Sequence, residues 1–257
     1  MGKLASKYRV AVIDERNEPY KLSLKSGRLI TPTLDTYIDY YEWINEKVFS
    51  HADIAPGRLG IIFSSGLNFI DSFLPCVLVS WAQSHVRSRV SLDMLPPNER
   101  FCRLAVDCLL KTKDDMYILA RRSQKVSEYK GYWDVSAAGW VDVEQFIATE
   151  NLQDQIIREL YEEIGLGWDQ IVKINQLGLC LNPMPEYSMA EVCFEAETDL
   201  EADIVLALSK GAKDSWEGKH SAFSGLDLFS ILNSELVKPA AAATIMLTLG
   251  LPFTEEL

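Results

Sequence analysis

The chain has 257 residues, of which 48% are hydrophobic, so it can bury one large core or two smaller ones. Its 37 Asp and Glu outnumber its 25 Lys and Arg, which gives a formal charge of -12. Most of the surface would therefore repel a phosphate backbone, and we expect no nucleic-acid polymer as a partner. A small anionic ligand stays compatible with this charge if a divalent cation bridges it to an acidic site.

Neither secretion nor membrane insertion is indicated. The five cysteines are odd in number and none forms a Cys-x-x-Cys pair, which is typical of reduced thiols. The longest apolar stretch, residues 70–82, is interrupted by Asp71 and Pro75 and is shorter than the ~20 residues of a membrane span. We expect a cytoplasmic protein with no membrane partner.

Residues 1–99 are predicted to form a small N-terminal α/β domain, which ends where Pro96 and Pro97 stop regular structure. Apolar residues at helical spacing indicate a helix around residues 38–48. Strands are indicated at 8–14 and 59–64. No residue of this domain carries recognisable chemistry.

Residues 100–257 are predicted to form a second domain with both strands and helices. One helix is indicated at 152–164, and another should begin near Pro239 and end before Gly250. Strand-like runs lie at 102–110, 116–121, 132–138, 174–181, 190–197 and 222–226. This order indicates an α+β or α/β/α sandwich.

The predicted helix at 152–164 combines an apolar stripe with a group of acids. Leu152, Ile156, Leu160 and Ile164 follow i, i+4 spacing, so one side of the helix should pack on a sheet. The acids are Glu159, Glu162 and Glu163, whose spacing gathers their carboxylates within reach of one shared point. Like charges at this spacing repel, and a hard cation such as Mg²⁺ would stabilise them. A solvated acidic face is the alternative.

The segment from Arg158 to Leu166 resembles the second half of the Nudix box, Gly-x5-Glu-x7-Arg-Glu-U-x-Glu-Glu-x-Gly-U, where U is bulky and apolar. Glu150 stands at the earlier glutamate position of the box. The leading glycine would fall on Glu144, whereas the nearest glycine is Gly139, so the loop between them carries five extra residues. The resemblance covers residues 103–249 and implies a Nudix α/β/α sandwich behind the smaller N-terminal domain.

The resemblance also implies roles for individual residues. Glu159 and Glu163 would bind Mg²⁺ or Mn²⁺, with help from Glu162 and from the main-chain carbonyl of Gly139. Three further residues of the box would act structurally. Glu150 would orient Arg158, and Gly165 would end the helix as a left-handed cap. We expect Arg158 to pair with Glu150 or with Asp154.

The catalytic base and the substrate contacts are less specific predictions. Some Nudix members use a glutamate of the box as the base, which here would be Glu159, Glu162 or Glu163. Others use a glutamate on a loop after the sheet, and Glu217 is the candidate of that kind. Arg121 and Arg122 could hold phosphate, and Trp140 and Glu186 could line the pocket. The alternative for each is an ordinary surface or core role.

The sequence around residues 112–126, the lengthened box and the N-terminal extension are similar to the UDP-sugar diphosphatase branch. We therefore expect a Mg²⁺-dependent hydrolase that cleaves a nucleoside diphosphate linked to another moiety, of UDP-sugar or ADP-ribose type. One alternative is a catalytically silent Nudix module that senses a nucleotide sugar or ADP-ribose. The other is an enzyme like isopentenyl diphosphate isomerase, although its Asn-x-Cys-Cys-x-His segment has no counterpart in this sequence. The N-terminal domain would shape the pocket or form a homodimer interface.

Overall fold

A computed structural model of the chain describes residues 101–126, 128–141, 151–182 and 189–251. Before residue 101 it describes four strands, which are β1 (Ala11–Asp14), β2 (Lys21–Leu24), β3 (Leu59–Ser64) and β4 (Phe73–Ser80). The helix predicted around residues 38–48 lies outside the described residues, as does most of the lengthened loop of the box, residues 142–150. Within the described part of the chain, no helix has the length and apolar character needed to cross a membrane.

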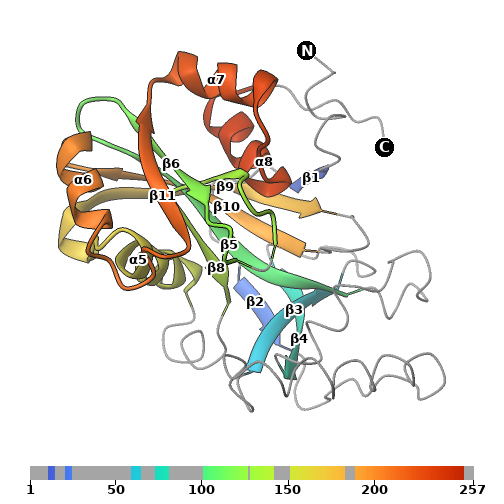
Figure 1. Cartoon of the computed structure of the whole chain (residues 1–257). Helices are drawn as coiled ribbons and strands as arrows, with labels where there is room; N and C mark the ends of the chain where they lie inside the picture. Colours follow the sequence, from blue (N-terminus) through green and yellow to red (C-terminus); the bar gives the residue numbers. More distant parts are fainter. Residues whose placement is uncertain are drawn as a thin grey trace.

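The central strand of the sheet is β5 (Phe101–Lys111), as Figure 1 shows. One edge of β5 pairs in parallel with β10 (Met189–Thr198), which in turn pairs antiparallel with β9 (Ile171–Asn182). The other edge of β5 pairs in succession with β3, with β8 (Ala137–Trp140) and with β6 (Tyr117–Arg122). The sheet continues from β6 to β7 (Trp133–Asp134) and β11 (Gly218–Phe223).

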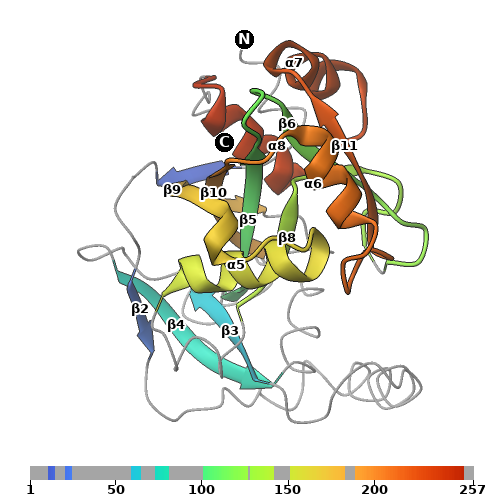
Figure 2. The ribbon, with the colours of Figure 1, turned by 90° about the vertical axis from the view of Figure 1, so that its left-hand side faces the viewer.

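Helices cover both faces of this sheet. On one face lie α5 (Leu152–Glu163) and α6 (Ala202–Ser209), and Figure 2 looks onto this side. On the other face lie α7 (Gly225–Ser234) and α8 (Pro239–Thr248) (Figure 1). A one-turn 3-10 helix, Trp168–Gln170, precedes β9. The predicted α/β/α sandwich is therefore confirmed.

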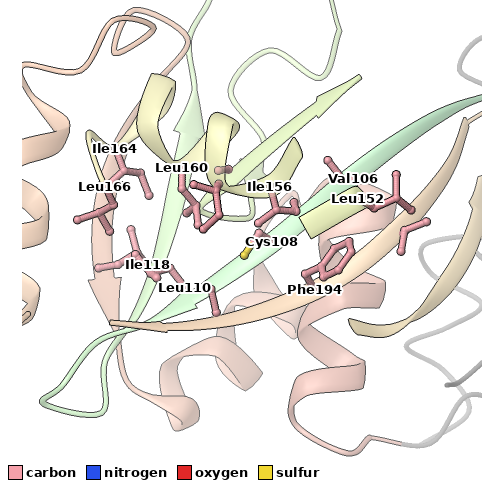
Figure 3. Close-up of a cluster of buried hydrophobic side chains, with 14 of the residues drawn as sticks. Val106, Cys108, Leu110, Ile118, Leu152, Ile156, Leu160, Ile164, Leu166 and Phe194 are labelled. Carbon is pink, nitrogen blue, oxygen red and sulfur yellow. The ribbon is translucent and has the colours of Figure 1, made fainter. Parts of the chain in front are cut away.

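The alternation of side chains along β5 supplies both layers with a core. Val106, Cys108 and Leu110 are fully buried in the cluster beneath α5, where they meet Ile156 and Leu160 (Figure 3). Leu109 points to the opposite face and belongs to the cluster beneath α7 and α8. Because side chains alternate across a strand, Asp107 shares the face of Leu109 and is an acid buried in the apolar core of that face.

Most predicted elements are confirmed, and two predicted strands need correction. The run predicted at 132–138 is two strands, because Ser136 interrupts it and bonds instead to the backbone of Leu110 and Ile118. The run predicted at 222–226 ends at Phe223, because Ser224 caps α7 and exchanges hydrogen bonds with Asp227. Helices α6 and α7 were not predicted.

The described strands of the first hundred residues join the same sheet. The β1 strand, at the end of the strand predicted at 8–14, pairs with β9. The predicted strand at 59–64 is confirmed as β3, which pairs Ile62 with Arg103 of β5 and also pairs with β4. The sheet thus runs without interruption across the boundary placed at residue 99.

Candidate functional site

Helix α5 is fixed at both ends. Its first turn is capped by Asn151, whose side chain accepts a hydrogen bond from the Gln153 amide at 2.9 Å. Its last turn ends at Gly165, which has a φ of +88° and whose amide bonds to the carbonyls of Leu160 and Tyr161. A residue with a Cβ is strained at this φ, so the predicted left-handed cap is confirmed. These caps and the buried stripe set the orientation of the glutamates.

The Glu159 carboxylate lies directly against the backbone of Gly139 in β8. A Cβ at residue 139 would stand 2.1 Å from Glu159 Cδ and 2.3 Å and 2.5 Å from its two oxygens. Only glycine leaves room for this close approach. The side-chain amide of Gln155 donates to Glu159 Oε1 at 2.6 Å. Burial, opposed by Arg158 and Gln155, raises the pKa of Glu159 to about 7.

Glu163 is held against the same strand, one turn further along α5. Its Oε1 accepts a hydrogen bond from the Ala138 amide at 2.9 Å. Burial, followed by the negative charge of Glu159, raises the pKa of Glu163 well above its ordinary value. Two carboxylates from α5 are thus buried together beside the Ala138–Gly139 backbone.

Glu162 points to a different partner. Its Oε1 accepts from Lys213 Nζ at 2.9 Å and lies 3.6 Å from Arg158 Nε. Among the residues described, no three Asp, Glu, His or Cys side chains are close enough to hold a metal ion. In the described residues the Glu162 carboxylate contacts Lys213 and Arg158, and its help in metal binding stays a prediction.

Arg158 forms ion pairs with two neighbouring glutamates of α5. Besides the contact with Glu162, its NH2 atom lies 3.9 Å from Glu159 Oε1. The expected partner Glu150 lies outside the described residues, and no described ion pair joins Arg158 to Asp154. Arg158 therefore braces the two neighbouring glutamates of its own helix.

A small pocket opens beside Glu163. Its lining includes Arg122, Asp134, Ala138, Glu163 and Glu217. Glu217 arrives from the loop before β11, where its carbonyl accepts a hydrogen bond from the Ser123 amide at 2.7 Å. Burial, opposed by Arg122, raises the pKa of the Glu217 carboxyl. The structure thus places Glu217 next to the box, while its role as a base stays a prediction.

The two predicted phosphate-binding arginines separate. Arg122 lines the pocket, where its NH1 atom donates to Asp134 Oδ2 at 2.8 Å. Arg121 is the preceding residue of β6 and points to the opposite face, where it lies 5.1 Å from the centre of the Trp133 ring and 3.4 Å from Glu235 Oε2. The pairing of both arginines on phosphate is therefore wrong for Arg121, because strand alternation turns it away.

The other predicted contacts are placed only in part. Trp140 is half-buried at the end of β8, and the pleat puts it on the same face as Ala138, which lines the pocket. Glu186 lies outside the described residues. The Nε2 atom of His220, in β11, lies 3.0 Å from the Ser136 carbonyl oxygen.

Sequence reasoning missed a buried group of charges behind the pocket. Lys238, just before α8, contacts Asp107, Asp134 and Glu191 (3.2, 3.7 and 2.8 Å), and all four residues are buried. The sequence offered one sign of this group, which is an acid among apolar residues in each of two predicted strands: Asp107 in β5 and Glu191 in β10.

The residues around Glu159 and Glu163 fit a hard divalent cation. Carboxylate and carbonyl oxygens are the ligands that Mg²⁺ prefers. The glycine at 139 lets a carboxylate reach the strand backbone, and burial of two acids side by side disfavours their charged forms until a cation neutralises them. The donor chemistry of these residues is that of a site for a hard cation.

Solved structures with a similar fold are Nudix proteins. Tm1382, a candidate Nudix hydrolase, gives a TM-score of 0.52 at 11% sequence identity, over 74% of this chain and 99% of that one. A mutT/nudix family protein from Listeria innocua is less similar, with 19% sequence identity over 58% of this chain and 92% of that one and a TM-score of 0.43. A NUDIX family hydrolase from Clostridium perfringens has 17% sequence identity over 57% of this chain and 97% of that one, with a TM-score of 0.38. No protein-family model matches the sequence, and no curated protein does. The chain has the Nudix fold.

Proposed function

We propose that the chain is a Mg²⁺-dependent Nudix hydrolase that cleaves the diphosphate bond of a nucleoside diphosphate linked to another moiety, of UDP-sugar or ADP-ribose type. One observation carries the proposal. Glu159 and Glu163 are buried side by side against the Ala138–Gly139 backbone, and the pocket beside them brings Arg122 and Glu217 together. Both glutamates belong to the segment that resembles the Nudix box.

Glu159 and Glu163 would hold the magnesium ion, with the Gly139 carbonyl as a further oxygen ligand. When bound, Mg²⁺ neutralises a diphosphate and lowers the pKa of a coordinated water molecule. Glu162, engaged by Lys213 and Arg158, would keep α5 and the loop before β11 in place.

Arg122 is the pocket residue suited to a phosphate oxygen. Its guanidinium offers several donors, of which NH1 contacts Asp134 and Nε contacts the Glu128 carbonyl. Glu217 would accept the proton of the attacking water. Burial raises the pKa of Glu217, which makes its carboxylate a stronger base than that of an exposed glutamate.

The test is a substrate panel with Mg²⁺ that contains UDP-glucose, ADP-ribose, NADH, a diadenosine polyphosphate and isopentenyl diphosphate. We expect release of a nucleoside monophosphate from at least one nucleotide. Glu159→Gln and Glu163→Gln should each lower kcat/KM by more than about a hundredfold, since a metal ion contributes several kcal/mol to the transition state. Glu197→Gln, on the exposed end of β10 where Glu197 pairs with Lys173, is the matched control and should change little.

Full activity in both glutamine variants would overturn the metal assignment. Tight binding of ADP-ribose or UDP-glucose without turnover would instead support a silent sensor. Conversion of isopentenyl diphosphate without phosphate release would support the isomerase alternative.

A further inference from the structure

Three acids surround one lysine in the interior, on the face of the sheet covered by α8. The Lys238 ammonium lies 2.8 Å from Glu191 Oε2, 3.2 Å from Asp107 Oδ1 and 3.7 Å from Asp134 Oδ1. Lys238 is 5% exposed, and none of the acids exceeds 3%. Such a group is costly to desolvate, and an apolar replacement of similar volume often does as well for stability alone. We therefore ask which neighbouring side chains this group holds in position.

Asp134 connects this group to the pocket. Its Oδ1 atom faces Lys238 and accepts a hydrogen bond from the Val135 amide at 2.9 Å. Its Oδ2 atom accepts from Arg122 NH1 at 2.8 Å. Asp134 and Arg122 both line the pocket that contains Glu163 and Glu217. One carboxylate thus bridges the buried lysine and the arginine of the site.

The backbone holds Lys238 in register with Asp134. The Lys238 amide donates to the Trp133 carbonyl at 2.8 Å, and the Trp133 amide donates to the Leu236 carbonyl at 2.8 Å. Pro239 then starts α8, which fixes the direction of the chain immediately after the lysine. The lysine and Asp134 are therefore placed by two hydrogen-bonded segments that cannot shift independently.

Asp107 and Glu191 anchor the far side of the ammonium. One oxygen of each acid binds Lys238, while Asp107 Oδ2 and Glu191 Oε1 have no hydrogen-bond partner within the described part of the chain. Burial, followed by the charge of Glu191, raises the pKa of Asp107 well above its ordinary value. A proton on Asp107 would leave two carboxylates for the two cations Lys238 and Arg122, so the charges of the network balance.

We propose that Lys238 is a positioning residue that, through Asp134, fixes the Arg122 guanidinium for a diphosphate in the pocket. The inference rests on the proposed function, because it takes Arg122 to be the phosphate-binding residue. Asp107 and Glu191 hold Lys238 from behind. Without the lysine, Asp134 loses its second cation and Arg122 loses its fixed orientation.

The experiment measures two affinities in each variant of the full chain. Calorimetry with methylenediphosphonate, a diphosphate that cannot be hydrolysed, in saturating Mn²⁺ reports on Arg122, and electron paramagnetic resonance with Mn²⁺ alone reports on the glutamates. Lys238→Met should weaken methylenediphosphonate binding about tenfold, which is the lower end of the effect of losing one hydrogen bond to a charged group, here that of Arg122 to the ligand. The affinity for Mn²⁺ should not change. Lys173→Met removes an exposed lysine from its pair with Glu197 and should change neither affinity.

Two further variants make the result specific. Lys238→Met combined with Glu191→Gln removes the ammonium together with the carboxylate that lies 2.8 Å from it, so it relieves the unpaired buried charge, and it should show the same loss of methylenediphosphonate affinity. In an Arg122→Gln background, Lys238→Met should cause no further loss, because both changes act through one contact.

Unchanged methylenediphosphonate affinity in Lys238→Met, or a loss that adds fully to that of Arg122→Gln, would overturn the inference. A parallel loss of Mn²⁺ affinity would also overturn it, because it would mean a general collapse of the site. Failure of the proposed function has a separate signature. In that case Glu163→Gln would leave Mn²⁺ binding intact.

Discussion

Gly139→Ala should displace the Glu159 carboxylate without unfolding the protein. The new Cβ would stand 2.1 Å from Glu159 Cδ, whereas ordinary contact begins at 3.4 Å, so the carboxylate must retreat by about 1.3 Å. The group that must move is the end of a long side chain. We therefore expect a small cost in stability, about 1 kcal/mol, at the lower end for overpacking in a core.

The cost to activity should be much larger. A displacement of about 1 Å in a group that holds the reacting atoms lowers rates about a hundredfold. The assay is kcat/KM with Mg²⁺ on the best nucleotide of the panel, together with Mn²⁺ affinity and the thermal midpoint. Gly211→Ala is the matched control, because the nearest atom to its Cβ would be the Leu208 carbonyl oxygen at an ordinary 3.7 Å.

A second variant tests the cause of the loss. Glu159→Asp withdraws the carboxylate by one carbon–carbon bond, about 1.5 Å, which matches the required retreat. In that background, Gly139→Ala should cost little beyond the loss already caused by Glu159→Asp. Wild-type kcat/KM and Mn²⁺ affinity in Gly139→Ala would refute the reasoning, as would an equal loss in Gly211→Ala.

Three further predictions concern stability. Folding raises the pKa of Glu159 from 4.5 to about 7, so the metal-free folded protein binds this proton more tightly than the unfolded chain does. The stability of the folded state should therefore fall as pH rises between these two values, and thermal midpoints should show the fall. Either Mg²⁺ or the substitution Glu159→Gln should reduce this dependence on pH. Leu160→Ala should lower the free energy of unfolding in urea by about 2–5 kcal/mol, because Leu160 is fully buried. Tyr161→Ala should lower it by less than about 0.5 kcal/mol, because Tyr161 is 61% exposed. Gly165→Ala should lower the same free energy by about 1–2 kcal/mol because its φ is +88°, and an unchanged urea midpoint would contradict the cap.

The elements that could be predicted are those with a regular buried face. Helix α5 has its apolar residues on one stripe, and its predicted span, 152–164, differs from the observed one by a single residue. Helix α6 was missed because its apolar residues surround it, so that Val205 is buried whereas Ile204 is 45% exposed. The start of α7 could have been found from Ser224 and Asp227, which have the spacing of a capping box. This helix start signal outweighs the strand that the neighbouring apolar residues indicate.

The candidate site was predictable where it depends on helical spacing alone. Glu159 and Glu163 lie one turn apart, and both contact β8. The partner of Glu162 was not predictable, since Lys213 comes from a loop far along the chain. The same holds for the buried charges behind the pocket, where Asp107 and Lys238 are 131 residues apart and meet only because α8 packs on β5. Contacts of this kind depend on tertiary packing, which local sequence patterns do not record.

The pairing of β3 with β5 has a consequence for any shortened form of the protein. Removal of the residues before Phe101 would leave the amides and carbonyls at 101–103 without the partners that β3 provides, and would also bare the β9 edge that β1 covers. Exposed strand edges invite pairing between molecules. A chain that starts at residue 100 should therefore self-associate even though it retains every described residue that lines the pocket, and light scattering in comparison with the 257-residue chain would reveal it.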